Sequence, residues 1–216
     1  MKYQLVVFDW DGTLLDSAGA IVNAIQASCR DLGLEEPSDA QARHVIGLGL
    51  MDAMRHAVPS LPPERIHEMV ERYRFHYLSA DHQLVLFPGV REMLARLQAA
   101  GHMLAVATGK SRLGLDRAFA HSGLGALFQA SRCADECHSK PHPQMLEELM
   151  AEFGVTSEST VMIGDTSHDL LMAKNAGVDG LAVTYGAHPL VHLQECQPKA
   201  CVHDVRELDQ WLKTYG

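Results

Sequence analysis

Residues 5–13 read LVVFDWDGT, an apolar run followed at once by two carboxylates two positions apart. The apolar run predicts a buried β-strand, and side chains two apart along a strand point to the same side. Asp9 and Asp11 are therefore expected close together, where two negative charges resist joint ionisation. A divalent cation or a shared proton offsets that repulsion, and a carboxylate pair in which one attacks and the other transfers protons is a known catalytic device. Taken alone, the segment is explained equally well by an ordinary Asp-Gly turn.

The composition is that of a globular chain of 216 residues, 47% hydrophobic and 21% charged. No apolar run approaches the ~18 residues of a membrane span, and no signal-peptide pattern is present, so we expect a cytoplasmic protein. The five scattered cysteines fit reduced thiols better than a disulfide framework. The net charge of -9 argues against nucleic acid and membrane partners. It permits a small anionic substrate, because one lysine and a metal ion can create a local positive site.

Hydrophobic periodicity divides the chain into a helical segment and an alternating segment. Helices are expected within residues 16–85, at 17–32, from 37 onward, at 50–58 and at 62–78. After residue 86, helical segments alternate with short apolar runs, which predict strands at 103–107, 127–130, 161–163, 181–183 and 200–202. This βαβ rhythm predicts an α/β protein, with a Rossmann-like parallel sheet core formed by 1–15 and 86–216 and an inserted α-helical cap domain at 16–85.

Polar residues follow several of the expected strands, at the edge where open α/β sheets bind their ligands. These residues are Asp9, Asp11, Thr108, Gly109, Lys110, Asp165 and Asp169, and Lys140 stands just before a proline-started helix. Each of them alone has an ordinary explanation as a turn residue, a helix cap or a surface charge. Their joint appearance at successive strand ends favours a single reaction centre.

In this combination and order, the chain resembles the haloacid dehalogenase superfamily, and within it the capped phosphatases of the phosphoglycolate phosphatase type. The segment from Asp9 to Thr13 is similar to the first family motif and Thr108 to the second. Lys140 is similar to the third motif, and Gly164-Asp165 with Asp169 to the fourth. One departure is Gly109, which stands where many relatives carry asparagine.

The resemblance implies a Mg²⁺-dependent phosphomonoester hydrolase that acts on a small phosphorylated metabolite through an aspartyl-phosphate. Asp9 would attack phosphorus, while Asp11 would protonate the leaving alcohol and then activate water. Thr108 and Lys140 would bind and neutralise the transferring phosphoryl group. The site residues implied for Mg²⁺ are Asp9, Asp11 through its backbone carbonyl, and Asp165. Asp169 would orient Lys140 or a metal-bound water, with Gly109 and Lys110 in supporting positions.

Other functions remain open at this stage. A phosphosugar mutase of the same superfamily is the main alternative, and a receiver domain or a noncatalytic phosphate-ligand binding protein comes from a different class. Gly47, Leu48 and Gly49 form a turn that in capped relatives faces the active site, so they are expected to help select the substrate, unless the turn only joins two helices. The sequence leaves open the metabolite and the choice between monomer and homodimer.

Cysteine and histidine residues give weaker signals. Cys133, Cys137 and His138 are too loosely spaced to predict a zinc site, and their role stays open. The thirteen histidines are expected to occupy scattered surface or hydrogen-bonded positions.

Overall fold

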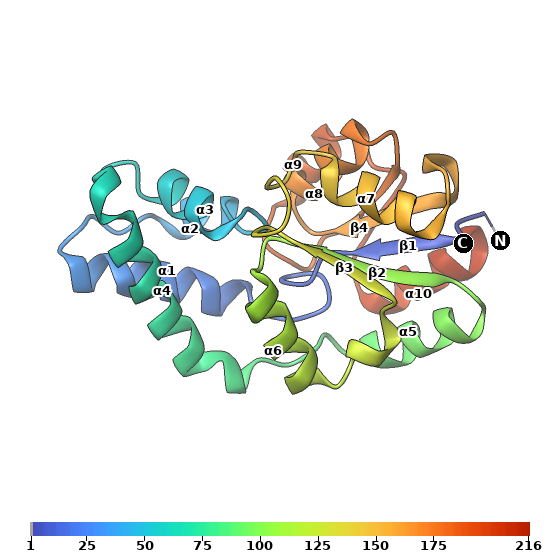
Figure 1. The fold of residues 1–216 in the computed structure, drawn as a ribbon, viewed down its shortest axis with the longest axis horizontal. Helices are drawn as coiled ribbons and strands as arrows, with labels where there is room; N and C mark the ends of the chain where they lie inside the picture. Colours follow the sequence, from blue (N-terminus) through green and yellow to red (C-terminus); the bar gives the residue numbers. More distant parts are fainter. Residues whose placement is uncertain (1) are drawn as a thin grey trace.

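A parallel six-stranded sheet forms the centre of the computed structural model, which describes residues 2–216 (Figure 1). The strands are β1 (Leu5–Phe8), β2 (Met103–Thr108), β3 (Ala130–Cys133), β4 (Thr160–Gly164), β5 (Asp179–Val183) and β6 (Cys201–Val202). Their order in the sheet is β3-β2-β1-β4-β5-β6, which places β1 between β2 and β4. In this register Val7 pairs with Ala105 on one side and with Met162 on the other. The chain order reverses at β1, and ligands bind at such a switch point, outside the carboxyl ends of the strands.

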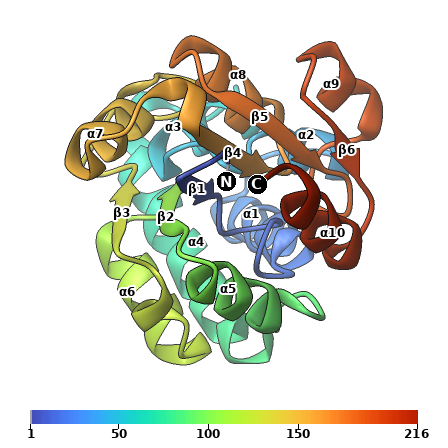
Figure 2. The same ribbon diagram turned by 90° about the vertical axis from the view of Figure 1, so that its right-hand side faces the viewer.

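Helices cover both faces of the sheet (Figure 2). One face is covered by α5 (Val90–Ala99), α6 (Arg112–Ser122) and α10 (Val205–Tyr215), and the other by α7 (Gln144–Phe153) and α8 (Ser167–Asn175), with α9 (Leu190–Glu195) against α8. Successive residues of β1 therefore enter different cores: Phe8 packs on the α5 side and Val7 on the α7 side. Burial on both faces explains why β1 reads as an unbroken apolar run.

Four helices between β1 and α5 form a separate layer, the helical insert, which lies at the left of Figure 1. They are α1 (Ala18–Leu32), α2 (Asp39–His44), α3 (Leu50–Ala57) and α4 (Ile66–Ala80). The insert has its own apolar core, in which Ile25, Met54 and Met69 are fully buried. Local sequence sets the helix ends: Gly33 ends α1 with a φ of 64°, and Ser38 begins α2 with a capping box to Gln41.

Two chain crossings join the insert to the sheet layer, and they are hydrogen-bonded to each other. The backbone N–H of Asp16 donates to the carbonyl of Val85 at 3.0 Å, and that of Phe87 donates to the carbonyl of Leu14 at 3.0 Å. The crossings therefore form a short two-stranded connection. Within residues 2–216, no helix combines the length and the apolar character needed to cross a bilayer.

The structure confirms the expected α/β class and corrects two local expectations. The third strand is Ala130–Cys133, whereas the prediction placed it at 127–130, where the structure has a short 3-10 helix ending at Leu127. This strand lies at the sheet edge and is only partly buried, and its Arg132 pairs with Glu148 at 2.7 Å, so the strand lacks an apolar run. Ser17 precedes α1 as expected, but its hydroxyl makes no cap and instead donates to Asp11 at 2.7 Å.

Candidate active site

The carboxyl ends of β1 and β4 bring three aspartates around one lysine. Lys140 is 2% exposed, and its Nζ donates to Asp9 Oδ1 at 2.7 Å and to Asp169 Oδ1 at 2.6 Å. Asp165 follows β4 directly and is fully buried. The side chain of Asp169 is held at the start of α8, where Oδ2 accepts hydrogen bonds from the backbone and hydroxyl of Thr166. Asp169 therefore fixes Lys140 beside Asp9.

Burial dominates the electrostatics of this cluster. It raises the pKa of Asp9 to about 7, although the charge of Lys140 acts in the opposite direction. Burial likewise raises the pKa of Asp165 well above its ordinary value, with the neighbouring carboxylates adding to the effect. Burial opposes the charge on Lys140, but Asp169 and Asp9 outweigh that effect and raise its pKa. The cluster thus holds three carboxyl groups and one ammonium group, and a further cation would offset the excess of carboxylates.

The same cluster fits a divalent metal ion. Carboxylate oxygens of Asp9, Asp165 and Asp169 lie within 4.8 Å of one another, the one group of this kind found among residues 2–216. Asp9 Oδ2 is buried and has no hydrogen-bond partner in the described chain. A buried anionic oxygen without a partner is costly, and a hard cation such as Mg²⁺ satisfies it. Both oxygens of Asp169 and both of Asp165 accept hydrogen bonds, so Asp9 Oδ2 is the oxygen of this group that is free for an ion.

Asp165 is tightly enclosed. Its Oδ1 accepts from the hydroxyl of Thr13 at 2.9 Å and its Oδ2 from the backbone N–H of Ala187 at 2.7 Å. A Cβ added at Gly12 or at Gly186 would collide with this carboxylate. The glycine in the first motif therefore allows the backbone after β1 to approach Asp165 closely.

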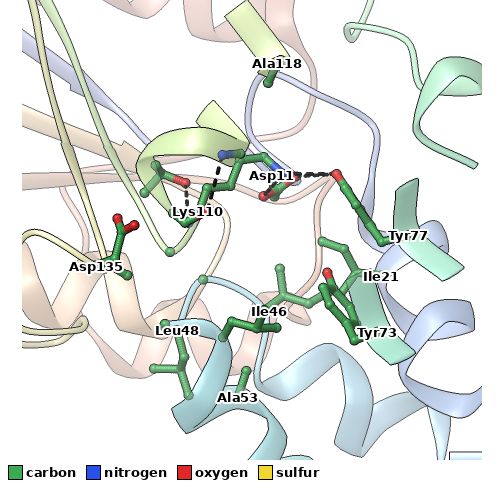
Figure 3. A pocket seen from close by; sticks show the side chains of 18 of the residues that line it. Asp11, Ile21, Ile46, Leu48, Ala53, Tyr73, Tyr77, Lys110, Ala118 and Asp135 are labelled. Atoms are coloured by element: carbon green, nitrogen blue, oxygen red, sulfur yellow. Dashed lines mark hydrogen bonds and ion pairs between the residues drawn. The ribbon is translucent and has the colours of Figure 1, made fainter. Parts of the chain in front are cut away.

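Asp11 points into a cavity between the two layers (Figure 3). Its Oδ1 accepts from Ser17 at 2.7 Å, and its Oδ2 lies 3.0 Å from Nζ of Lys110. The same ammonium group donates to the hydroxyl of Tyr77 on α4 at 3.0 Å. The carboxylate is thus held by Lys110 of the sheet layer and by Ser17 at the start of the insert, and Lys110 in turn binds Tyr77 on α4.

Thr108 and the glycine-bearing turn complete the lining of the cavity. Thr108 is buried at the end of β2, and its Oγ1 accepts from the backbone N–H of Lys110 at 3.2 Å. The turn at Gly47–Gly49 reaches the sheet layer, where the N–H of Gly49 donates to Ser139 Oγ at 2.8 Å. A Cβ added at Gly109 would collide with the carbonyl of Leu48 and lie 2.6 Å from that of Gly47. Close contact with this turn therefore explains why position 109 has no side chain.

The structure thus brings together all the residues that the sequence analysis singled out for the reaction. Asp9, Asp165, Asp169 and Lys140 form one buried cluster, while Asp9, Asp11, Thr108, Gly109, Lys110 and the turn at 47–49 line one cavity of about 810 Å³. In contrast, Cys133, Cys137 and His138 do not form a metal-binding group within the described residues. Cys137 is a free thiol with its Sγ 3.7 Å from a carboxylate oxygen of Glu148.

Comparison with known proteins identifies the family. A family model described as haloacid dehalogenase-like hydrolase matches residues 6–183. The chain belongs to this family. A protein of Dickeya dadantii named probable phosphatase IndB is 38% identical over 94% of this chain and 91% of its own length. A phosphoglycolate phosphatase of Aliivibrio fischeri is 31% identical over 90% of each chain.

A solved structure shares the whole fold. The crystal structure of a predicted phosphoglycolate phosphatase from Haemophilus somnus superposes with a TM-score of 0.87, covers 98% of this chain and 99% of its own, and is 24% identical. Its likeness shows the fold alone. With the family match and the phosphatase relatives, the comparisons confirm the predicted superfamily, and the haloacid dehalogenase-like hydrolase described here is a phosphatase.

One feature of this haloacid dehalogenase-like hydrolase escaped the sequence analysis, a group of four histidines between the layers. His44 ends α2, and its ring stacks on that of His188 at a centroid distance of 5.2 Å. Its carbonyl accepts from Nε2 of His168 at 2.7 Å and of His188 at 3.1 Å. His192 packs against the same rings. The four-residue spacing of His188 and His192 in the sequence was the available signal, but their meeting with His44 depends on the tertiary fold.

Proposed function

We propose that the protein is a Mg²⁺-dependent phosphomonoester hydrolase that acts on a small phosphorylated metabolite through an aspartyl-phosphate. The observation that carries the proposal is the fully buried Asp9, with one oxygen bonded to Lys140 and the other without a partner. Such a carboxylate combines a fixed position with one oxygen that no hydrogen bond engages. A carboxylate nucleophile divides a difficult hydrolysis into two easier displacements.

In the first displacement, a carboxylate oxygen of Asp9 attacks phosphorus and the bond from phosphorus to the alcohol oxygen breaks. Asp11 gives its proton to the departing alkoxide. Its position in the cavity suits this role, because the alcohol leaves on the side away from the attacking oxygen. In the second displacement, Asp11 takes a proton from water, the water oxygen attacks phosphorus, and the bond to Asp9 breaks to release inorganic phosphate.

Lys140 and Thr108 stabilise the charge that develops on the phosphoryl oxygens. Lys140 is already fixed by Asp169, so it needs no rearrangement during the reaction, and preorganised charge of this kind is a large catalytic contribution. Asp9, Asp165 and the backbone carbonyl of Asp11 would hold Mg²⁺. The bound ion would neutralise the carboxylates and let the anionic substrate approach. We further propose residues 16–85 as a cap over this site and, since all five cysteines are free, a cytoplasmic location.

The test is phosphate release from a panel of phosphomonoesters, with and without Mg²⁺. Asp9→Asn removes the nucleophile and is expected to abolish turnover. Asp11→Asn removes the acid and base, and a loss of about 10²- to 10⁴-fold is expected. Acid quenching during turnover should trap phosphate on the peptide that contains Asp9. Full activity of either folded variant contradicts the mechanism, and a product that keeps its phosphoryl group at a new position would identify a mutase instead.

A further inference from the structure

The cavity beside Asp11 has apolar walls. Ile21 and Ile25 on α1, Ile46 before the glycine-bearing turn and Met54 on α3 all line it, and each of them is at most 8% exposed. All four come from the helical insert, so the insert supplies apolar lining to the cavity that Asp9 and Asp11 also line. Apolar walls with a few converging polar groups are typical of sites for small organic molecules.

Two tyrosines of α4 add an aromatic surface to one side of the cavity (Figure 3). Tyr73 and Tyr77 are one helical turn apart, and their rings stack at a centroid distance of 5.7 Å and an angle of 17°. The hydroxyl of Tyr77 is bonded to Lys110, which places its ring close to Asp11. An alcohol bound beside Asp11, with its phosphate at Asp9, would lie next to these two rings.

The cavity continues to the surface between apolar side chains. Met51 is 37% exposed, Leu78 40% and Leu113 79%, and all three line the cavity. They come from α3, α4 and α6, so they contribute from three separate elements. A gathering of exposed apolar side chains around a cavity mouth marks a binding groove.

Positive charge within the cavity is largely engaged. Three lysine or arginine residues line it, and two of them are paired, Lys110 with Asp11 at 3.0 Å and Arg117 with Asp81 at 2.9 Å. The third, Arg74, is solvent-exposed. A carboxylate next to the phosphate, as in a two-carbon acid, would therefore meet two cations that are already paired with aspartates, and leaving it unpaired is costly.

We infer that the preferred substrates of this hydrolase are phosphomonoesters whose alcohol carries an extended aliphatic or aromatic body. This inference rests on the proposed function and names the substrate class of the same site. Tyr73 is then a specificity-determining residue, because its ring borders the part of the cavity beyond Tyr77 and Asp11. Contact with the apolar cavity wall should raise kcat/KM only for the part of the alcohol that lies against that wall.

The test compares kcat/KM for methyl, n-butyl, n-hexyl and benzyl phosphate with that for 2-phosphoglycolate. The four alkyl and benzyl esters have uncharged alcohols of similar basicity, so differences among them report binding to the cavity. Each buried methylene should raise kcat/KM by about three- to four-fold until the cavity is filled. The expected order is hexyl and benzyl above butyl, butyl above methyl, and 2-phosphoglycolate below hexyl.

Tyr73→Ala and Phe75→Ala form a matched pair on the same helix. Phe75 is 59% exposed and does not line the cavity. Tyr73→Ala should lower kcat/KM for hexyl phosphate about ten-fold more than for methyl phosphate. Phe75→Ala should leave the chain-length dependence intact, and thermal unfolding reports whether both variants are folded.

The outcomes separate the two proposals. Asp9-dependent phosphate release with no gain along the alkyl series, or with 2-phosphoglycolate preferred, overturns the inference and leaves the phosphatase intact. Absence of phosphate release from every ester overturns both. An equal effect of Tyr73→Ala on methyl and hexyl phosphate overturns the role of Tyr73.

Discussion

Asp9 combines the two properties that its proposed roles require, an exceptional burial and an oxygen without a partner. Because burial raises its pKa to about 7, protons and Mg²⁺ compete for the same carboxylate near neutral pH. Deprotonation is needed for metal binding, so Mg²⁺ affinity should increase as the pH rises through about 7, and the raised pKa of Asp165 adds to the same pH dependence. Below that value, affinity should fall about ten-fold per pH unit if one proton is displaced. Calorimetric titration with Mg²⁺ at about pH 6 and about pH 8 measures the change.

Proton release gives an independent readout of the same competition. At about pH 6, the apparent binding enthalpy should vary with the ionisation enthalpy of the buffer, because the displaced proton is taken up by the buffer. The matched control is Asp9→Asn, whose amide does not titrate and whose affinity should depend less on pH. Equal Mg²⁺ affinities at both pH values for the wild-type protein would contradict the assignment of Asp9 as a titrating ligand.

At the scale of elements, two hydrogen bonds join α2 of the insert to the sheet layer. The carbonyl of His44 on α2 accepts one from a histidine of α8 and one from a histidine just before α9. His168 and His188 both donate to His44, and burial lowers the pKa of both rings, to about 4 for His188, so they are neutral donors at physiological pH. His168→Phe keeps a ring but removes one donor. A net hydrogen bond contributes about 1 kcal/mol, so the population of detached insert should increase about five-fold.

Hydrogen exchange of the amides in residues 44–49 measures this detachment. Exchange there should be faster in His168→Phe, while the amides of the sheet should exchange as in the wild type. His168→Gln restores a side-chain donor and should recover part of the protection. If His168→Phe leaves the exchange of 44–49 unchanged, the histidine contact does not hold the insert in place.

The elements differ in how much of them the sequence could predict. Local sequence alone was sufficient to predict β1, which is an apolar run that ends at Asp9, and a helix in the region of α2, which starts with a capping box. The edge strand β3 carries polar side chains that pair with α7, and Ser17 has the identity of a helix cap but bonds to Asp11. Likewise, the apolar cavity wall and the four histidines combine residues from distant segments. Sequence therefore predicted what each strand end carries, whereas contacts between the layers required the structure.

At the scale of the molecule, two layers with separate cores meet at the active site, and the chain passes between them at two crossings that are hydrogen-bonded to each other. Such a connection allows the insert to move as a body, with residues 13–17 and 86–89 as hinges, because the hydrogen bonds between the crossings need not break. Closure would exclude bulk water from the phosphorylated Asp9.

With Mg²⁺ and orthovanadate bound, we expect slower hydrogen exchange in the turn at 44–49 and altered exchange in both hinges. Asp9→Asn should weaken this response, since the vanadium atom loses its nucleophile. Identical exchange of both hinges with and without the analogue would show that the layers do not move during the reaction.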